Sequence, residues 1–294
     1  MEGFIDTLNA VIWSNALVYL CLGAGAYFTL ATLFLQIRCL PDMIRQLKSG
    51  ESSEQGISSF QSLMISLAGR VGVGNIAGVA TAIAFGGPGA VFWMWLVALL
   101  GSATSFIECC LAQIYKETDR DTGEYRGGPA YYIEKTYKHT KAAPFMLVYA
   151  IIFAVCMLLA TSYFLPGIQA NGVAAAVDNA WGINIWVSAT IMTVLLAFII
   201  IGGVKRIANF ASMVVPFMAG IYIIIAIVVL FANASQIPEV FGTIVRAAFD
   251  KEAAFSGMLG AAIMWGVKRG IYSNEAGQGT GPQLSLIHIS EPTR

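Results

Sequence analysis

Apolar segments long enough to cross a lipid bilayer recur along the chain, and they constrain its fold more than any other feature. A helix of about 20 predominantly apolar residues spans the hydrocarbon core. Charged residues make up only 12% of the 294 residues, whereas a soluble domain carries roughly 25%. We therefore expect an all-α polytopic membrane protein embedded in the lipid bilayer. The expected spanning segments are 17–37, 58–86, 90–115, 144–172, 184–202 and 207–232, with a seventh that begins near Ala253 and breaks up after Trp265.

The charge balance and the reactive residues exclude several other classes of protein. Lys and Arg total 17, Asp and Glu total 17, and no basic tract is present, so nucleic acid is not an expected partner. The five cysteines lack metal-ligand spacing. Every aspartate lies outside the apolar cores, and neither an H-E-x-x-H motif nor a P-loop occurs, so we expect no enzyme, no cofactor and no ATP-driven pump. A channel remains an alternative to a carrier.

The positions of the basic residues predict how the chain is oriented. Loops on one side of the expected spans carry eleven lysines and arginines, and loops on the other side carry two. Because basic residues are retained on the cytoplasmic side, we expect the N-terminus outside and the loop 116–142 inside. Residues 1–16 contain no Lys or Arg, so they do not resemble a cleaved signal peptide. A multi-pass protein of the plasma membrane is expected.

The second apolar segment has an unusual interior, with the sequence G-R-V-G-V-G-N at 69–75. Glycine costs a helix interior about 1 kcal/mol relative to alanine, and arginine at this depth costs at least a few kcal/mol. Interrupted backbone survives in hydrocarbon only where protein or a water-filled cavity satisfies its polar groups. We therefore predict a discontinuous helix whose ends offer a positive dipole to a carboxylate and free carbonyl groups to a cation.

A related pattern occurs in the seventh apolar segment. The motif R-x₄-N-x-A-G begins at Arg70 and again at Arg269. The expected topology orients the two copies in opposite directions, and such inverted repeats are typical of secondary transporters. The alternative is that the glycines only allow close packing against a neighbouring helix.

Two carboxylates lie in or near the expected spans. Glu275 falls in the second interruption, where it is either a buried functional group or the partner of Arg269 in an ion pair. Glu108 is expected near the inner interface, where it is paired or extends toward water. Because membrane-depth carboxylates and histidines are so few, the sequence favours sodium over a proton as the coupling ion, and a proton-coupled alternative depends on Glu275.

Five stretches resemble hallmark sequences of the sodium:alanine symporter family, the alanine or glycine:cation symporters. They are G-G-P-G-A-V-F-W-M-W-L at 86–96, G-V-G-N-I-A-G-V-A at 72–80, S-N-E-A-G at 273–277, G-G-P-A-Y-Y at 127–132 and Q-A-N at 169–171. The resemblance implies the inverted five-helix repeat (LeuT-like) fold of the amino acid–polyamine–cation superfamily, with one extra N-terminal helix. It also implies sodium-coupled symport of small neutral amino acids, alanine or glycine, across the bacterial inner membrane.

The resemblance further implies a substrate site formed by the two interruptions and flanked by the fourth apolar segment. The implied substrate-binding residues are Gly72, Gly74, Asn75, Phe164, Gln169, Asn171, Asn274 and Glu275. The backbone carbonyls of Gly72 and Val73 are the implied ligands of the sodium ion. A proton-coupled amino acid transporter and a channel-like membrane protein remain alternatives, and the oligomeric state is left open.

The same resemblance divides the chain into four parts. The family pattern continues for four more helices after Pro282, so we expect the second repeat to be truncated. The final residues resemble a translated sequencing adapter and are expected to be foreign. The parts are 1–57 with the extra helix, 58–235 with the first repeat and a broken helix at 69–78, 236–283 with the start of the second repeat and a broken helix at 266–281, and the tail 284–294.

Overall fold

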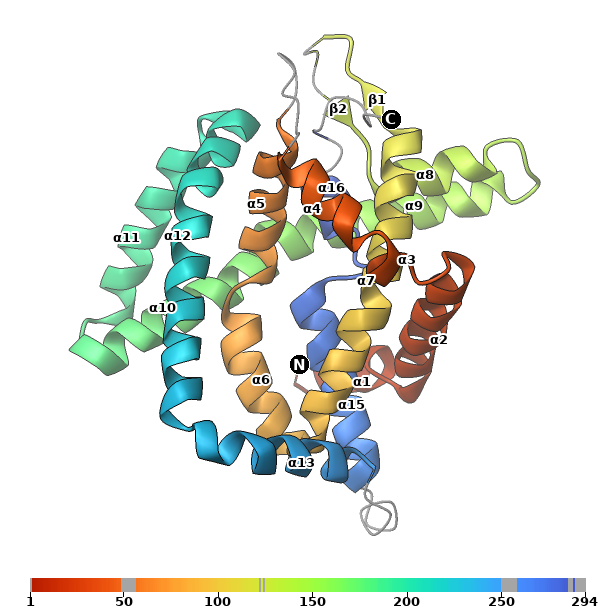
Figure 1. Cartoon of the computed structure of the whole chain (residues 1–294). Helices are drawn as coiled ribbons and strands as arrows, with labels where there is room; N and C mark the ends of the chain where they lie inside the picture. The colour runs from red at the N-terminus through yellow and green to blue at the C-terminus, as the bar shows by residue number, and fades with distance from the viewer. Residues whose placement is uncertain are drawn as a thin grey trace. The chain divides into compact units, whose positions relative to one another are not determined.

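The computed structural model describes residues 2–48, 57–121, 123, 125–249, 258–284 and 288, and most of these residues are helical (Figure 1). The only strands among the described residues are β1 (Glu117–Thr118) and β2 (Tyr125–Arg126), which pair antiparallel. The helices are α1 (Glu2–Ile12), α2 (Asn15–Ala31), α3 (Leu35–Arg38), α4 (Leu40–Lys48), α5 (Ser59–Arg70), α6 (Val73–Gly86), α7 (Gly89–Tyr115), α8 (Pro129–Tyr137), α9 (Ala143–Leu159), the π-turn η1 (Ala160–Phe164), α10 (Leu165–Trp181), α11 (Ile185–Ile200), α12 (Gly203–Ala232), the 3₁₀ turn η2 (Ala234–Gln236), α13 (Ile237–Ala248), α15 (Met258–Asn274) and α16 (Thr280–Leu284).

Five helical segments are long and apolar enough to cross a membrane, and α11 is apolar but shorter. Many bulky apolar side chains on α9 to α12 are exposed, including Leu158, Phe198 and Ile224. An apolar surface this extensive is stable in contact with lipid and not with water. The expectation of a helical, polytopic membrane protein is confirmed. The five segments are Asn9–Ala31, Ser59–Gly86, Gly89–Tyr115, Ala143–Trp181 and Gly203–Ala232.

Two of the expected spans end elsewhere than the sequence indicated. The first helix stops at Ala31 and not at residue 37, because Leu33 and Phe34 adopt left-handed φ values of 54° and 55°. The fourth span continues past residue 172 to Trp181. Its last two turns are rich in alanine, which favours helix, and the helix ends at Gly182, whose φ is 66°.

The seventh apolar segment also differs from the expectation. Helix α15 continues past Trp265 to Asn274, so the interruption comes later than Trp265 but within the predicted broken helix at 266–281. The chain then turns through positive φ values at Glu275, Gly277 and Gly279 before α16 begins. The expected start near Ala253 lies outside the described residues.

The chain divides into two compact units. The first comprises 1–44, 74–107 and 219–278, and the second comprises 45–73, 108–218 and 279–294.

In the first unit, α15 packs closely against α7. A Cβ atom on Gly266 would lie 2.5 Å from the carbonyl oxygen of Ala90, and one on Gly270 would lie 3.2 Å from the side chain of Val97. These two glycines form a G-x-x-x-G motif, which lets membrane helices approach each other. Val97 and Val267 continue this contact into an apolar cluster that includes Val18 of α2.

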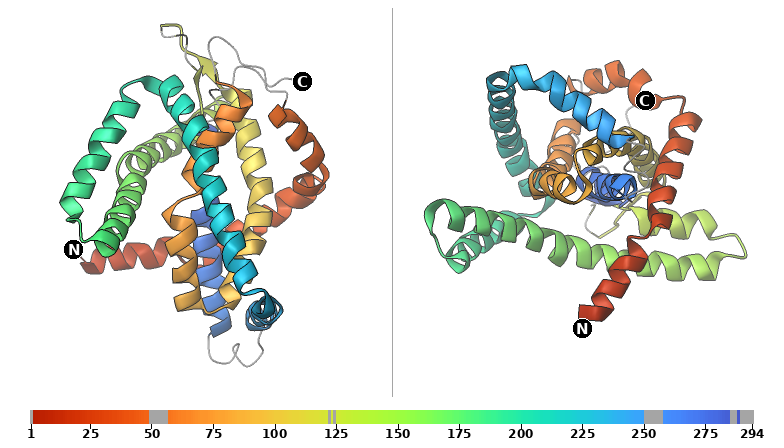
Figure 2. Two further views of the ribbon diagram at one scale, coloured as in Figure 1. Left: turned by 60° about the vertical axis from the view of Figure 1, so that its left-hand side comes forward. Right: turned by 90° about the horizontal axis from the view of Figure 1, so that it is seen from below.

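The second unit contains a long helical rod, from α9 through η1 to α10, which both views in Figure 2 show as continuous. Pro166 lacks the N–H that would bond to the carbonyl of Ser162 in an α-helix, and the backbone widens into the π-turn before it. In the same unit Met64 of α5 packs against Ala211 and Val215 of α12.

Polar contacts organise the loop between α7 and α9 in the second unit. Arg126 pairs with Asp119 across the β1–β2 hairpin. Lys135 Nζ lies 2.7 Å from Glu117 Oε1, and this charged hydrogen bond lowers the pKa of Glu117. The predicted cytoplasmic loop is therefore a folded segment of the second unit.

Candidate functional site: two interrupted helices

The first interruption separates α5 from α6 in the middle of an apolar segment. Helix α5 ends at Arg70, Val71 is extended with φ −103° and ψ 98°, and α6 begins at Val73 (Figure 1). The break thus falls at Val71 and Gly72, within the range 69–78 that the sequence indicates. The first N–H groups of a helix have no partner inside it, so the start of α6 presents backbone donors.

In the second unit, Gln169 of α10 accepts a hydrogen bond from one of these backbone donors. Its side-chain oxygen accepts a hydrogen bond of 3.0 Å from the N–H of Val73. A Cβ atom on Gly72 would lie 3.0 Å from the same carboxamide, and one on Gly172 would lie 2.7 Å from the side chain of Val73. Two glycines therefore let α10 approach the interruption, and Gln169 caps the first residue of α6.

Tyr272 of α15 borders the next residue of α6 in the first unit. A Cβ atom on Gly74, which is buried, would lie 2.8 Å from Tyr272 Cε1. The hydroxyl of Tyr272 is buried and has no hydrogen-bond partner among the described residues. Asn75 is half-buried, and within the described part of the chain its carboxamide makes no hydrogen bond. Beside the first turn of α6 there are therefore two polar groups without hydrogen bonds among the described residues, the carboxamide of Asn75 and the hydroxyl of Tyr272.

The second interruption, in the first unit, is held by Asn274. Its side-chain nitrogen donates to the carbonyl of Val97 at 3.3 Å, and its side-chain oxygen accepts from the N–H of Ala276 at 2.9 Å. Glu275 follows with φ 55°, a left-handed value that costs a residue other than glycine roughly 1–2 kcal/mol. The carboxamide of Asn274 is thus engaged in fixing the turn.

Glu108 caps the helix after the second interruption, within the second unit. The side chain is 6% exposed, and its Oε2 accepts a hydrogen bond of 3.2 Å from the N–H of Gly279, next to the start of α16. The Glu108 carboxylate also lies close to Tyr132, whose pKa is raised by burial and then by this negative charge. Of the two states expected for Glu108, paired or extending toward water, the structure shows the paired one, because the carboxylate accepts a hydrogen bond from a buried backbone N–H.

The remaining predicted residues lie on the surface of the second unit. Phe164 ends the π-turn η1 and is 58% exposed, with its ring against Tyr163. Asn171 is exposed on α10. Sequence reasoning missed the roles of Tyr272 and Glu108, and no local pattern marks either one. It also missed the close helix packing at Gly266, although the G-x-x-x-G motif was a readable signal.

The described residues contain no group of three or more His, Cys, Asp and Glu side chains that could hold a metal ion. A hard cation such as sodium is also bound by carbonyl oxygens. The last carbonyl groups of α5 have no partner inside that helix, so oxygen ligands are available at the interruption. The arrangement suits a ligand with a carboxylate and a small cation.

Comparison with known proteins shows the family to which the chain belongs. Residues 1–293 match the model of the sodium:alanine symporter family, a match that includes most of the tail expected to be foreign. YrbD of Bacillus subtilis is 52% identical over the whole chain, which covers 59% of that protein. The sodium/proton-dependent alanine carrier protein of Bacillus sp. is 44% identical over 86% of the chain and 55% of its own length. The sodium/alanine symporter AgcS of Methanococcus maripaludis is 41% identical over 95% of the chain and 61% of its own length. The chain thus spans about three fifths of the length of these relatives.

Proposed function

Because the chain belongs to the sodium:alanine symporter family, we propose that it forms the larger part of a secondary transporter that carries alanine or glycine into the cell together with sodium. The observation that carries this proposal is the interrupted helix α5–α6, whose first turn offers backbone N–H groups in the middle of an apolar span. Such interruptions bind the charged groups of substrates in secondary transporters. The protein is proposed to be a carrier and not an enzyme.

The substrate carboxylate is proposed to bind at the first turn of α6. Gly74 lets the ring of Tyr272 pack directly against the backbone, and the unpaired carboxamide of Asn75 supplies a further donor next to it. The positive end of the helix dipole favours a negative group at this position. The sodium ion is proposed to bind to the carbonyl oxygens of Gly72 and Val73, with Gln169 fixing the backbone that presents them.

The remaining residues of the proposed site have supporting roles. Phe164 and Asn171 flank the substrate, and Glu275 shapes the second interruption together with Asn274. The carboxamide of Asn274 acts through the backbone turn that it holds, since both of its ends are already bonded.

The two interruptions are proposed to be counterparts in an inverted five-helix repeat of the LeuT-like type. Each is followed by a helix whose first N–H groups are capped by a side chain from another helix, Gln169 at Val73 and Glu108 at Gly279. The R-x₄-N-x-A-G pattern overlaps both interruptions, the first near its start at Val71 and Gly72 and the second near its end, after Asn274. In transporters of this type, transport proceeds as one bundle rocks against the other around the site.

The chain is proposed to lie in the plasma membrane with its N-terminus outside and the loop 116–142 inside. We expect a single cysteine at Lys141, in a cysteine-free full-length carrier that contains this chain, to react with an impermeant thiol reagent only after the cells are permeabilised. A cysteine at Gln236, in the exposed turn η2, is the matched control and reacts in intact cells. Labelling of Lys141→Cys in intact cells would overturn the orientation.

Ion coupling can be tested by transport in proteoliposomes. We expect the full-length carrier to accumulate alanine under an inward sodium gradient, with no loss when an ionophore collapses the proton gradient. The physical reason is that carbonyl oxygens at the interruption bind a hard cation but cannot carry a proton. Relatives named sodium/proton-dependent carriers make proton coupling the second candidate. Uptake that survives without sodium and disappears with the proton gradient would assign coupling to a carboxylate such as Glu275.

A further inference from the structure

Helix α13 in the first unit has one apolar face and one polar face. Three exposed polar side chains, Glu239, Thr243 and Arg246, lie together on one side of it. The Thr243 hydroxyl and the Arg246 guanidinium donate hydrogen bonds to backbone carbonyls of the same helix, so they need no partner from another element. The apolar residues recur with helical spacing on the other side and include Ile237, Val240, Phe241, Ile244, Val245 and Ala248.

Only part of the apolar face packs on protein. The end of α13 lies against the start of α7, where a Cβ atom on Gly89 would stand 2.6 Å from the carbonyl oxygen of Ala247. A stripe of three apolar side chains, each four residues after the last, stays open on the same face. Ile237 is 41% exposed, Phe241 57% and Val245 37%. This stripe is a surface that favours an apolar neighbour over water.

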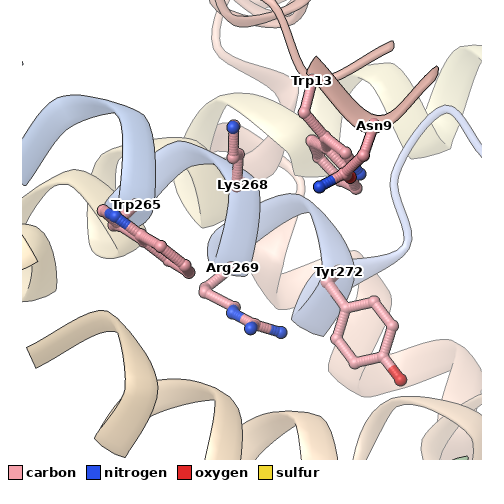
Figure 3. Close-up of a pocket in the computed structure, with 6 residues that line it drawn as sticks. All are labelled: Asn9, Trp13, Trp265, Lys268, Arg269 and Tyr272. Carbon is pink, nitrogen blue, oxygen red and sulfur yellow. The ribbon is translucent and has the colours of Figure 1, made fainter. Parts of the chain in front are cut away.

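Aromatic rings gather around the turn between α6 and α7, close to α13. Three pairs of rings have centroids between 4.8 and 5.7 Å apart, and they are Phe241 with Trp95, Phe249 with Phe92, and Trp265 with Phe85. The Trp265 ring extends from the side of α15 (Figure 3). Tryptophan is enriched where membrane-spanning helices meet water. The rings therefore indicate that α13 lies at the level of a membrane surface.

The preceding span supports the same level. Helix α12 has 30 residues and is therefore about 45 Å long, more than the roughly 30 Å of the hydrocarbon core. Its last turns expose Val229 and Phe231, and its final residues belong to the same unit as α13. After the short turn η2 the chain changes direction, and α13 runs across the line of α12 (Figure 1, Figure 2). A helix with two unlike faces that leaves a span in this way fits the boundary between lipid and water.

We propose that α13 lies in the headgroup region of the bilayer and that the partner of its open stripe is lipid. Ile237, Phe241 and Val245 contact acyl chains, whereas Glu239 and Arg246 face water. The apolar lipid-facing surface at the end of α12 thus continues along α13. Because α13 also packs on the start of α7, it fixes the level at which that helix enters the membrane. The orientation proposed above makes this the outer surface.

Quenching by brominated lipid tests the proposal. A cysteine-free full-length carrier with Ile237→Cys is labelled with a small fluorophore and reconstituted into phosphatidylcholine vesicles, with or without bromine on the acyl chains. We expect bromine to remove about half of the emission or more, because the apolar face of an interfacial helix lies about 5–10 Å into the boundary with the acyl chains. Glu239→Cys is the matched control, since it lies in the same turn but about 160° away around the helix. Its label is expected to lose less than about a tenth.

The comparison is repeated at the other end of α13 with Val245→Cys and Arg246→Cys, so that the test does not depend on one substitution. Equal, weak quenching within each pair would overturn the proposal, because the stripe would then be in water or covered by protein. Equal, strong quenching would also overturn it, because the whole helix would then lie among acyl chains. The result is independent of alanine uptake, which tests the proposed function.

Discussion

Replacing Gly74 with leucine in a full-length carrier is expected to reduce alanine uptake to background while the protein still inserts into the membrane. The Cβ atom alone would lie 2.8 Å from the ring of Tyr272, so the new side chain would displace that ring from the first turn of α6. Overpacking of this kind typically costs 1–3 kcal/mol, and here it also disturbs the place where the substrate carboxylate is proposed to bind. Uptake of radiolabelled alanine into proteoliposomes measures the effect.

Gly23→Leu is the matched control for this substitution. Gly23 lies on an apolar helix of the same unit, and no atom lies within 4 Å of the position that its Cβ would occupy. We expect that variant to transport like the parent. Normal uptake by Gly74→Leu would show that the substrate binds elsewhere, and that Gly74 serves only helix packing.

Gly266→Leu is expected to destabilise the fold itself and not only transport. A Cβ atom there would lie 2.5 Å from the carbonyl oxygen of Ala90 and 2.6 Å from the side chain of Trp93, so α15 would have to move away from α7. Helix association in a membrane depends on this close packing, and we expect a loss of several degrees in the midpoint of thermal unfolding. Fluorescence-detected gel filtration after heating measures that midpoint in detergent.

The control for this variant lies on the same helix. Gly260 has open space where its Cβ would stand, so Gly260→Leu is expected to leave the midpoint within about 1 °C of the parent. Equal midpoints for Gly266→Leu and Gly260→Leu would contradict the packing of α15 on α7.

Much of the fold could be predicted because the length of each apolar segment indicates whether it forms a membrane-spanning helix. The span over Gly203–Ala232 follows from hydropathy alone, and the interruption after Arg70 follows from glycines and an arginine at membrane depth. The positions of the helix ends were predicted less accurately. Left-handed φ values at Leu33 and Phe34 end the first span early, and the sequence carries no glycine there to mark the turn.

The candidate site could be predicted only where its residues are neighbours in the sequence. Gly72 and Asn75 lie inside one motif, and their position at the start of α6 follows from that motif. The hydrogen bonds that the N–H groups of Val73 and Gly279 donate to Gln169 and Glu108 join residues far apart in the chain. Such contacts depend on tertiary packing, which hydrophobic periodicity does not encode.

Equilibrium binding of alanine to the purified full-length carrier, measured with and without sodium and in the absence of any gradient, tests the central claim most directly. If the interrupted helix α5–α6 holds the carboxylate and the ion side by side, each stabilises the other by a coupling free energy. We predict that sodium lowers the Kd for alanine about tenfold or more, and that alanine tightens sodium binding by the same factor. An alanine Kd that is the same in sodium and in choline would contradict the account.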